Sequence, residues 1–369
     1  MALLVPFLAV APLHLLIPSS AKAHGISTPV QVGISFSPRR AAYLGLDYRP
    51  AFQRLLDMHF RVIRLSTYWD QVDQAGYGEL DWMMAEAKRA HQPVVLTVGM
   101  KALGWPEFYL PASVADITAL GPGTDVAADS TLRAATVDYI RETVLRYRDN
   151  PALTAWQVEN EPFNRAGPQR LWIDAEFLGQ EIASVRELDG HHRPLIVNAF
   201  SHFNLVFDQA SARQGFDLRQ WLGFDADSAE RDGLSALNRG DVLGLDVYTA
   251  IGYQFLGQDH LSRADNDWPD RLARVRELAQ KQGKHAWVTE AQAEPWESSG
   301  NSYTDPKSTS PQAIRRIFNN LKEAGFSTVL FWGAEYWLWR ADHGDPRWIE
   351  AIKAIQRGEA AAPAVALRS

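Results

Sequence analysis

Two glutamates in this sequence end apolar segments that have the pattern of β-strands. Glu161 follows the segment LTAWQVEN (153–160), and Glu290 closes the segment KHAWVTE (284–290). A single strand-end carboxylate is most often a solvated loop residue. A pair that faced one pocket could cleave an acetal, because one carboxyl can protonate the departing oxygen while the other, ionised, attacks or stabilises the carbon.

The two glutamates can meet only if the fold brings their strand ends together. Short apolar segments alternate with longer amphipathic ones along the chain, which is typical of a parallel sheet with helical crossovers. Eight such segments occur, at 29–36, 60–66, 93–99, 153–160, 193–199, 241–248, 284–290 and 327–333. Eight units close a (β/α)8 TIM barrel of the α/β class, which we predict as a single domain. An open, doubly wound sheet is the alternative.

One helical pattern, at 310–325, also carries clear end signals. Ser310 is suited to cap its first turn, Pro311 is suited to the first helical position, and Gly325 is suited to end it. This segment precedes the eighth apolar segment, as a crossover helix should.

In a barrel, reactive side chains project from the carboxyl ends of the strands. The fourth and seventh segments, which end in Glu161 and Glu290, would lie roughly opposite each other across the mouth. The other strand ends supply Arg64 (second), Asn160 (fourth), Asn198 (fifth), Tyr248 (sixth) and Trp332 (eighth).

These strand ends resemble a known family. ENEPFN at 159–164, WVTE at 287–290, RL at 64–65 and FWG at 331–333 are similar to clan A of the glycoside hydrolases, closest to the cellulase-like glycoside hydrolase family 5. The resemblance covers about residues 29 to 357 and implies a retaining mechanism. It assigns the acid/base to Glu161, the nucleophile to Glu290, a 2-hydroxyl contact to Asn160, hydrogen bonds to Glu290 to Arg64 and Tyr248, and the floor of the sugar subsite to Trp332.

The residues themselves suggest similar roles. A cation and a phenol beside Glu290 would lower its pKa, whereas the charge of Glu290 and partial burial would raise the pKa of Glu161. The alternatives are that Arg64 is a buried ion-pair partner and that Tyr248 and Trp332 are packing residues.

Three further glutamates lie near the pair in the sequence. Glu294 and Glu297 are rivals of Glu290, but they fall beyond the strand, where a solvated or subsite role is expected. Glu159 shares the fourth strand with Glu161, and we expect it to form a structural salt bridge.

Aromatic loops follow several strands and could line a carbohydrate cleft. We expect Asn198 and Trp69 to contact substrate. Trp105 is a candidate stacking surface in loop 99–111, and Glu335 is a candidate partner of sugar hydroxyls in loop 333–340. A hydrophobic cover over the barrel rim is the alternative for both loops.

The composition limits the function classes. The chain has 37 basic and 44 acidic residues and no basic tract, which disfavours a nucleic-acid partner. Cysteine is absent, so disulfides and thiolate metal sites are excluded. The sequence has no H-x-H or H-E-x-x-H motif, no phosphate-binding loop and no G-x-S-x-G motif. We therefore expect no metal and no cofactor.

The two ends of the chain differ from its middle. Residues 1–23 form an apolar run that ends in an A-x-A site, Ala21 to Ala23, and we predict a secretory signal peptide there. The run is too short and too interrupted by proline to be a membrane anchor, although no Lys or Arg precedes it. Residues 24–357 would form the barrel, and 358–369 a flexible tail.

The sequence thus predicts a secreted or periplasmic retaining β-glycosidase that hydrolyses a β-linked oligo- or polysaccharide. Two alternatives use the same residues. One is a noncatalytic carbohydrate-binding barrel, and the other is a transglycosylase.

Overall fold

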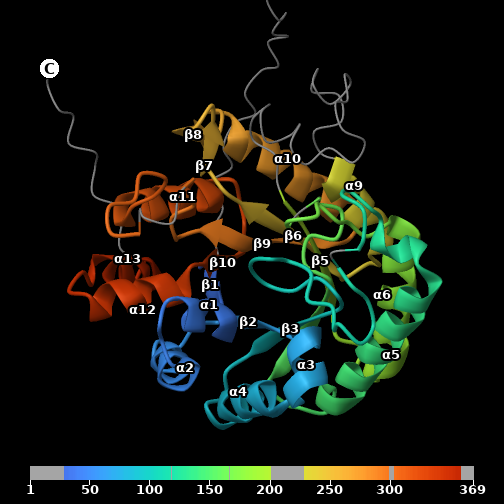
Figure 1. Cartoon of the computed structure of the whole chain (residues 1–369). Helices are drawn as coiled ribbons and strands as arrows, with labels where there is room; N and C mark the ends of the chain where they lie inside the picture. Colours follow the sequence, from blue (N-terminus) through green and yellow to red (C-terminus); the bar gives the residue numbers. More distant parts are fainter. Residues whose placement is uncertain (1–28, 118, 166, 201–227, 299–302, 359–369) are drawn as a thin grey trace, which may run out of the picture.

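Eight parallel strands close into a barrel in the computed structural model, which describes residues 29–117, 119–165, 167–200, 228–298 and 303–358. The strand order around the barrel is β1-β10-β9-β6-β5-β4-β3-β2, and helices surround it (Figure 1). The predicted single-domain TIM barrel is confirmed. The predicted signal peptide lies outside the described residues, and so does the predicted tail beyond residue 358.

All eight predicted strands are present. They are β1 (Gln31–Ser35), β2 (Ile63–Ser66), β3 (Val94–Val98), β4 (Leu153–Val158), β5 (Leu195–Phe200), β6 (Val242–Val247), β9 (His285–Gln292) and β10 (Thr328–Trp332).

The described helices lie mainly on the outside of the barrel (Figure 1). They are α1 (Pro38–Tyr43), α2 (Tyr48–Leu56), α3 (Trp69–Ala75), α4 (Gly78–Arg89), α5 (Ser130–Tyr147), α6 (Ala175–Asp189), α9 (Ser228–Ala236), α10 (Trp268–Lys281), α11 (Pro311–Glu323), α12 (Ala334–Asp342) and α13 (Arg347–Gln356). The predicted start of α11 is confirmed, because the Ser310 hydroxyl accepts from the backbone N–H of Ala313 over 3.2 Å.

A small cluster of aliphatic side chains, separate from the main core, fills the inside of the barrel. It comprises Val62, Val95, Ala155, Ile196, Val242 and Leu330. Side chains alternate along a strand, so the residue two positions further on points to the same interior. Arg64, Gln157 and Asn198 follow Val62, Ala155 and Ile196 by this spacing. Strand geometry therefore delivers these polar groups to the carboxyl end of the barrel.

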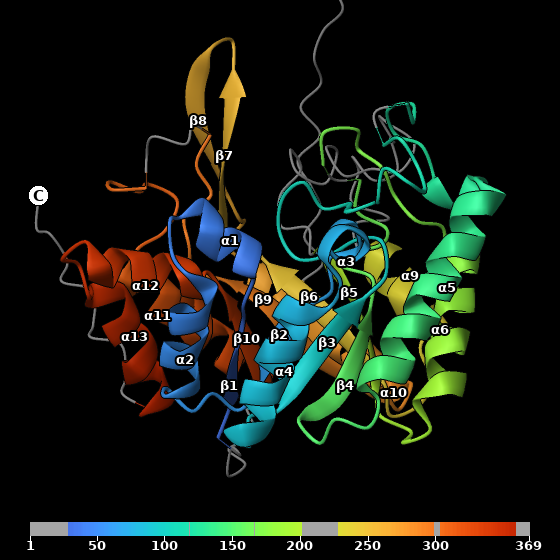
Figure 2. The ribbon, with the colours of Figure 1, turned by 60° about the horizontal axis from the view of Figure 1, so that its bottom comes forward.

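A β-hairpin that the sequence analysis did not predict follows β6. Strands β7 (Ala250–Phe255) and β8 (Gln258–Arg263) pair with each other outside the barrel sheet. Figure 2 shows the hairpin projecting beyond the end of the barrel at which α1 lies. Its turn is made by Leu256 and Gly257, both with positive φ.

None of the helices within the described residues combines the length and the apolar character needed to cross a bilayer.

Candidate active site

Three buried carboxylates meet at the carboxyl end of the barrel. Glu161 follows β4, Asp246 lies on β6 and Glu290 lies on β9, and an oxygen of each lies within 4.8 Å of an oxygen of the other two. The two glutamates of the predicted pair therefore face each other.

Glu290 is held by a cation and a phenol. The guanidinium of Arg64, which is fully buried, pairs with Oε1 of Glu290, and the Tyr248 hydroxyl donates to Oε2 over 2.5 Å. Burial nevertheless raises the pKa of Glu290 above its ordinary value, and Arg64 and Tyr248 act against this rise. The expected lowering of the pKa is wrong, because desolvation of a fully buried carboxyl outweighs its two partners.

Two further hydrogen bonds fix the Arg64 side chain. Its Nε donates to the Ser35 hydroxyl over 2.9 Å, and its Nη1 donates to Oε1 of Gln157 over 3.1 Å. The guanidinium is thus oriented by β1 and β4 as well as by Glu290. A bidentate or branched arrangement of this kind suits arginine and not lysine.

Glu161 sits in an unusual backbone conformation with φ of 47°. Its carboxylate accepts from Nδ2 of Asn164 over 2.8 Å, and its backbone N–H donates to Oδ1 of Asn198 over 2.8 Å. The buried Nζ of Lys101 donates to the backbone carbonyls of Glu161 and Asn164 over 2.7 and 3.0 Å. A left-handed conformation is costly for a residue with a side chain, so these contacts hold a strained residue in place.

Asn198 links the two polar residues at the end of β4. Its Nδ2 donates to Oδ1 of Asn160 over 2.9 Å, while its Oδ1 accepts from Glu161 and from Nε2 of Gln157. Asn198 itself is fully buried. The structure therefore brings Asn198 to the carboxylates, but as a support beneath Asn160 and Glu161 and not as an exposed substrate contact.

Trp332 lies in a buried cluster with Tyr248, the hydrogen-bond partner of Glu290, and with Phe200, Leu103 and Ile251. Its indole Nε1 donates to Oε1 of Glu294 over 2.9 Å. The other oxygen of Glu294 accepts from Arg40 over 3.0 Å. Glu294 is buried, which contradicts the solvated role that was one of its two expected roles, and it anchors the Trp332 ring.

Glu159 and Glu297 accept hydrogen bonds from backbone N–H groups. Glu159 was expected to form a salt bridge, but its two oxygens accept from the backbone N–H groups of Met100 and Lys101 over 2.8 and 2.6 Å. Gly99 makes this possible, because a Cβ there would lie 2.2 Å from Oε1 of Glu159. Glu297 accepts from the backbone N–H of Ser308 over 2.8 Å.

Two of three further predicted substrate contacts, Trp69 and Glu335, are buried. Trp69 begins α3 and is buried in the main core, where it stacks on Tyr139 with ring centroids 4.8 Å apart. Glu335 is buried on α12, accepts from the backbone N–H of Ser37, and has a pKa raised to about 8 by burial. Trp105 is 72% exposed, so it alone of the three offers an open aromatic face. The short helices α3 and α12 turn the other two inward.

The difference between Trp69 and Trp105 predicts opposite effects on stability. We expect Trp69→Ala to lower the free energy of unfolding by about 3 to 5 kcal/mol, because it removes a stacked core ring. Trp105→Ala should change it by about 0.5 kcal/mol or less, since an exposed side chain loses little packing. Urea denaturation followed by circular dichroism measures both. Equal losses in the two variants would contradict this placement of the rings.

Asp246 and Gln157 are functional candidates that the sequence analysis missed. Asp246 precedes Tyr248 by two residues, and Gln157 precedes Glu159 by two. Alternation along a strand therefore indicates that each pair points to the same face.

Glu107 is a further candidate that the sequence analysis missed. Burial raises its pKa to about 8, Lys101 opposes that rise, and the charges of Glu161 and Glu290 add to it. The backbone of Glu107 has a φ of 80°, and no sequence pattern predicts this conformation at that position.

Glu161, Asp246 and Glu290 are also close enough to hold a cation between them. Most of their oxygens are already engaged, however. Glu290 accepts from Arg64 and Tyr248, and Asp246 accepts from Asn198 and Thr289. A guanidinium in direct contact with the cluster supplies the positive charge that a metal would supply elsewhere. The arrangement therefore suits a carboxylate pair more than a metal centre.

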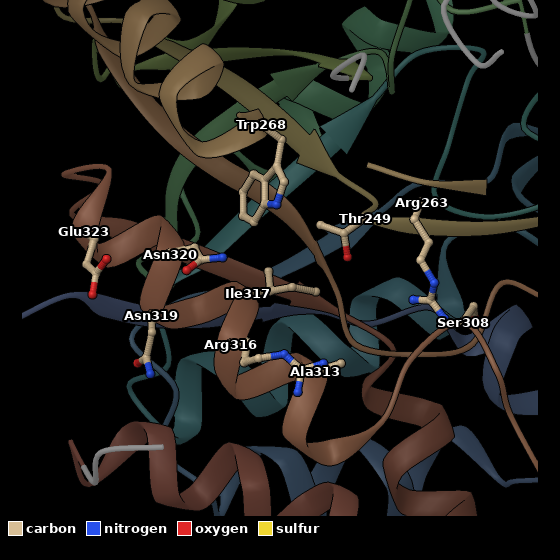
Figure 3. A pocket seen from close by; sticks show the side chains of 10 residues that line it. All are labelled: Thr249, Arg263, Trp268, Ser308, Ala313, Arg316, Ile317, Asn319, Asn320 and Glu323. Carbon is tan, nitrogen blue, oxygen red and sulfur yellow. The ribbon is translucent and has the colours of Figure 1, made fainter. Parts of the chain in front are cut away.

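A separate cavity of about 370 Å³ opens on the flank of the barrel, away from these carboxylates. It lies between the start of α10, α11 and the base of the hairpin (Figure 3). It is lined by Thr249, Arg263, Trp268, Ser308, Ala313, Arg316, Ile317, Asn319, Asn320 and Glu323. No member of the carboxylate cluster lines it, so it is not the site of the proposed chemistry.

No protein-family model matches the sequence, and no curated protein matches it. Solved structures do match in fold. GH5_18 from Bifidobacterium longum in complex with Manβ1-4GlcNAc is 13% identical, with a TM-score of 0.56, over 90% of this chain and 80% of that one. The exo-β-1,4-mannosidase from Opitutaceae bacterium strain TAV5 is 13% identical, with a TM-score of 0.52, over 83% of this chain and 52% of that one.

The β-galactosidase from the psychrophilic Marinomonas ef1 is 13% identical, with a TM-score of 0.50, over 82% of this chain and 53% of that one. This chain thus spans about half the length of that enzyme. At such identities the likeness concerns the fold. The predicted resemblance to clan A glycoside hydrolases is therefore confirmed as a shared barrel fold.

Proposed function

We propose that this protein is an exported retaining β-glycosidase that hydrolyses O-glycosidic bonds of a β-linked oligo- or polysaccharide. One observation carries the proposal. The carboxylates of Glu161 and Glu290 approach within 4.8 Å at the carboxyl end of the barrel, and Glu290 alone is held by Arg64 and Tyr248. The pair is therefore asymmetric, as a reaction that needs one acid and one anion requires.

In the first step, an ionised oxygen of Glu290 attacks the anomeric carbon of the bound sugar. The bond to the leaving oxygen breaks, and Glu161 donates its proton to that oxygen. A covalent glycosyl ester on Glu290 results. Arg64 and Tyr248 favour the ionised form of Glu290 before attack. Their interaction with Glu290 weakens as the carboxylate loses its charge in forming the ester.

In the second step, Glu161 acts as a base. It takes a proton from water, whose oxygen attacks the anomeric carbon from the face that the leaving group vacated. The ester bond to Glu290 breaks, and the product keeps the β configuration after two inversions. Both carboxylates regain their starting states.

Two neighbours would hold the sugar during these steps. The Oδ1 atom of Asn160 already accepts from Asn198 and Gln157, so its Nδ2 remains as a donor for a sugar hydroxyl. Trp332 would support the ring from below, because aromatic faces pack on the apolar faces of sugars. Its bond to Glu294 fixes the plane of the indole.

The sugar is best identified with a panel of β-linked glycans. The fold relatives named above are described as acting on or binding β-mannosides and β-galactosides, so these belong in the panel with glucans and xylans. We expect release of reducing ends from at least one member. Binding without release over long incubation would favour the noncatalytic barrel, and elongated products in the presence of sugar acceptors would favour the transglycosylase.

Export forms a separate part of the proposal, supported by the apolar run in residues 1–23. Expression of the full chain in a host that secretes proteins tests it. We expect the mature protein outside the cytoplasm, with an N-terminus at His24. Retention of residues 1–23 on a cytoplasmic product would contradict it.

Tyr248→Phe should move the acidic limb of the pH profile of kcat/KM to higher pH. The reaction needs ionised Glu290, and the Tyr248 hydroxyl favours that form. Its removal therefore raises the pKa of Glu290 further, and activity is lost at a higher pH on acidification. We also expect kcat to fall about 10- to 100-fold, as for the loss of a hydrogen bond to a charged group.

Tyr253→Phe is the matched control for this prediction. Tyr253 lies on the hairpin, where its ring stacks on His260 with centroids 5.3 Å apart, and the partners of the Glu290 carboxylate are Arg64 and Tyr248 instead. The control should keep the acidic limb of the parent protein. An acidic limb that stays in place or moves to lower pH in Tyr248→Phe would contradict the assigned hydrogen bond.

A further inference from the structure

Asp246 lies at the centre of the site, and its carboxylate takes no part in the two proposed reaction steps. It lies on β6, is fully buried, and is within 4.8 Å of both Glu161 and Glu290. Oδ2 accepts from Nδ2 of Asn198 over 2.5 Å, and Oδ1 makes a 2.6 Å hydrogen bond with the Thr289 hydroxyl. Because it is shielded from solvent, Asp246 can affect a substrate only through its neighbours.

The contact with Asn198 decides which way that amide faces. An asparagine amide has a donor end and an acceptor end, and a 180° rotation exchanges them. With the acceptor Asp246 on one side, the NH2 group must face Asp246, and Oδ1 must face the other way. A rotated amide would place two oxygens 2.5 Å apart. The carboxyl thus fixes the orientation of Asn198.

That orientation sets two groups of the site at once. The Nδ2 atom of Asn198 also donates to Oδ1 of Asn160, which leaves Nδ2 of Asn160 as the donor toward the sugar. The Oδ1 atom of Asn198 accepts from the backbone N–H of Glu161, the residue with φ of 47°. A rotated Asn198 would lose both bonds, and the strained backbone of Glu161 would lose a partner.

We propose that Asp246 is a positioning residue that, by fixing the Asn198 amide, orients Asn160 and holds the backbone of Glu161. The proposal rests on the proposed function for its kinetic consequences, although the hydrogen-bond geometry stands by itself. Asp246 thus acts on the reacting groups through the Asn198 side chain.

Both oxygens of Asp246 accept from neutral side chains, Asn198 and Thr289. Burial, followed by the charges of Glu290 and Glu161, raises the pKa of Asp246 well above its ordinary value, and the charge of Arg64 and the hydrogen bond from Thr289 act against this rise. Asp246→Asn would match the carboxyl in shape and keep an oxygen that accepts from Asn198.

Kinetics on a β-glycoside cleaved by the parent protein tests the proposal. We expect Asp246→Ala and Asn198→Ala each to lower kcat about 100-fold, and the double variant to lose about the same and not about 10⁴-fold, because both act through one amide. Asp246→Asn should keep kcat within about threefold, since its Oδ1 can accept from Asn198. Multiplicative losses, or an Asp246→Asn variant as impaired as Asp246→Ala, would overturn the proposal.

Hydrogen exchange gives a readout that does not depend on turnover. In the parent protein and in Asp246→Asn, the Glu161 amide should exchange slowly, whereas Asp246→Ala should make the peptide 158–164 exchange at least about tenfold faster. Thr289→Val is the matched control, because it removes the other partner of the same carboxyl. Equal acceleration in Thr289→Val would mean general loosening and would overturn the proposal.

The two measurements separate this proposal from the proposed function. If the parent protein cleaves no glycan, the function fails, and the exchange pattern alone decides the role of Asp246. If Asp246→Ala does not fold, Asp246→Leu replaces it, because leucine fills the space and still offers no acceptor. Slow exchange at Glu161 in that variant would overturn the positioning role.

Discussion

Glu290→Ala is expected to abolish turnover of an aryl β-glycoside, and added azide is expected to restore it with formation of an α-glycosyl azide. The loss should be at least about 10⁴-fold, because the variant cannot form the covalent intermediate. Azide is small enough to occupy the space of the missing carboxylate, between Arg64 and Tyr248. It would attack from the face opposite the leaving group, so the product would have inverted configuration. Rates and product configuration can both be followed by NMR.

Glu294→Ala is the matched control for this experiment. Glu294 lies four residues beyond Glu290, and its carboxylate is bonded to Arg40 and Trp332. Its removal loosens the Trp332 ring without removing a nucleophile, so we expect a smaller loss that azide does not restore. The assignment fails if Glu290→Ala retains full turnover or if azide restores the Glu294 variant instead.

The fold was predictable from the sequence because each strand is a separate apolar run. A parallel strand buried on both faces has little polar interruption, and several runs in this chain carry a polar residue at or near their carboxyl ends. The hairpin was missed for a local reason. Its turn uses Leu256 at positive φ before Gly257, whereas Asn-Gly or Asp-Gly is the usual signal for a two-residue turn.

The pair Glu161 and Glu290 could be predicted because position along a barrel strand determines which end a side chain reaches. The burial of Trp69 and Glu335 could not be predicted. Each lies just past a strand, where the direction of a short helix determines whether the side chain faces the barrel mouth or the core. Burial of Glu290 reversed its expected pKa shift. Sequence identifies the charged partners, but only the packing around them determines desolvation.

Asp246 shows a further limit of sequence reasoning. An aspartate inside an apolar strand stands out, yet its role depends on which atom of the Asn198 amide faces it. That orientation comes from the contacts across β4, β5 and β6, since Gln157, Asn198 and Asp246 bond in series. A polar network of this kind specifies one arrangement only when every member is satisfied.

Glu161→Ala is expected to impair natural glycans far more than aryl glycosides with a good leaving group. A poor leaving group needs the proton of Glu161, and its loss should cost about 10³-fold or more in kcat/KM. A dinitrophenolate leaves without protonation, so the glycosyl ester on Glu290 would still form. It would then accumulate, because no base activates water for the second step. Stopped-flow release of dinitrophenol should show a burst followed by slow turnover.

Azide distinguishes this role from that of Glu290. In Glu161→Ala the ester occupies the α face, so azide can attack only from the β face that the leaving group vacated, and a β-glycosyl azide should form. The opposite configuration from the two variants follows from one geometry, in which the two carboxylates stand on opposite faces of the same sugar ring. An α-glycosyl azide from Glu161→Ala would show that the roles of the two glutamates are exchanged. The absence of a burst with dinitrophenyl substrates would contradict the role of Glu161 as the base of the second step. Equal impairment of good and poor leaving groups would show that Glu161 donates no proton to the departing oxygen.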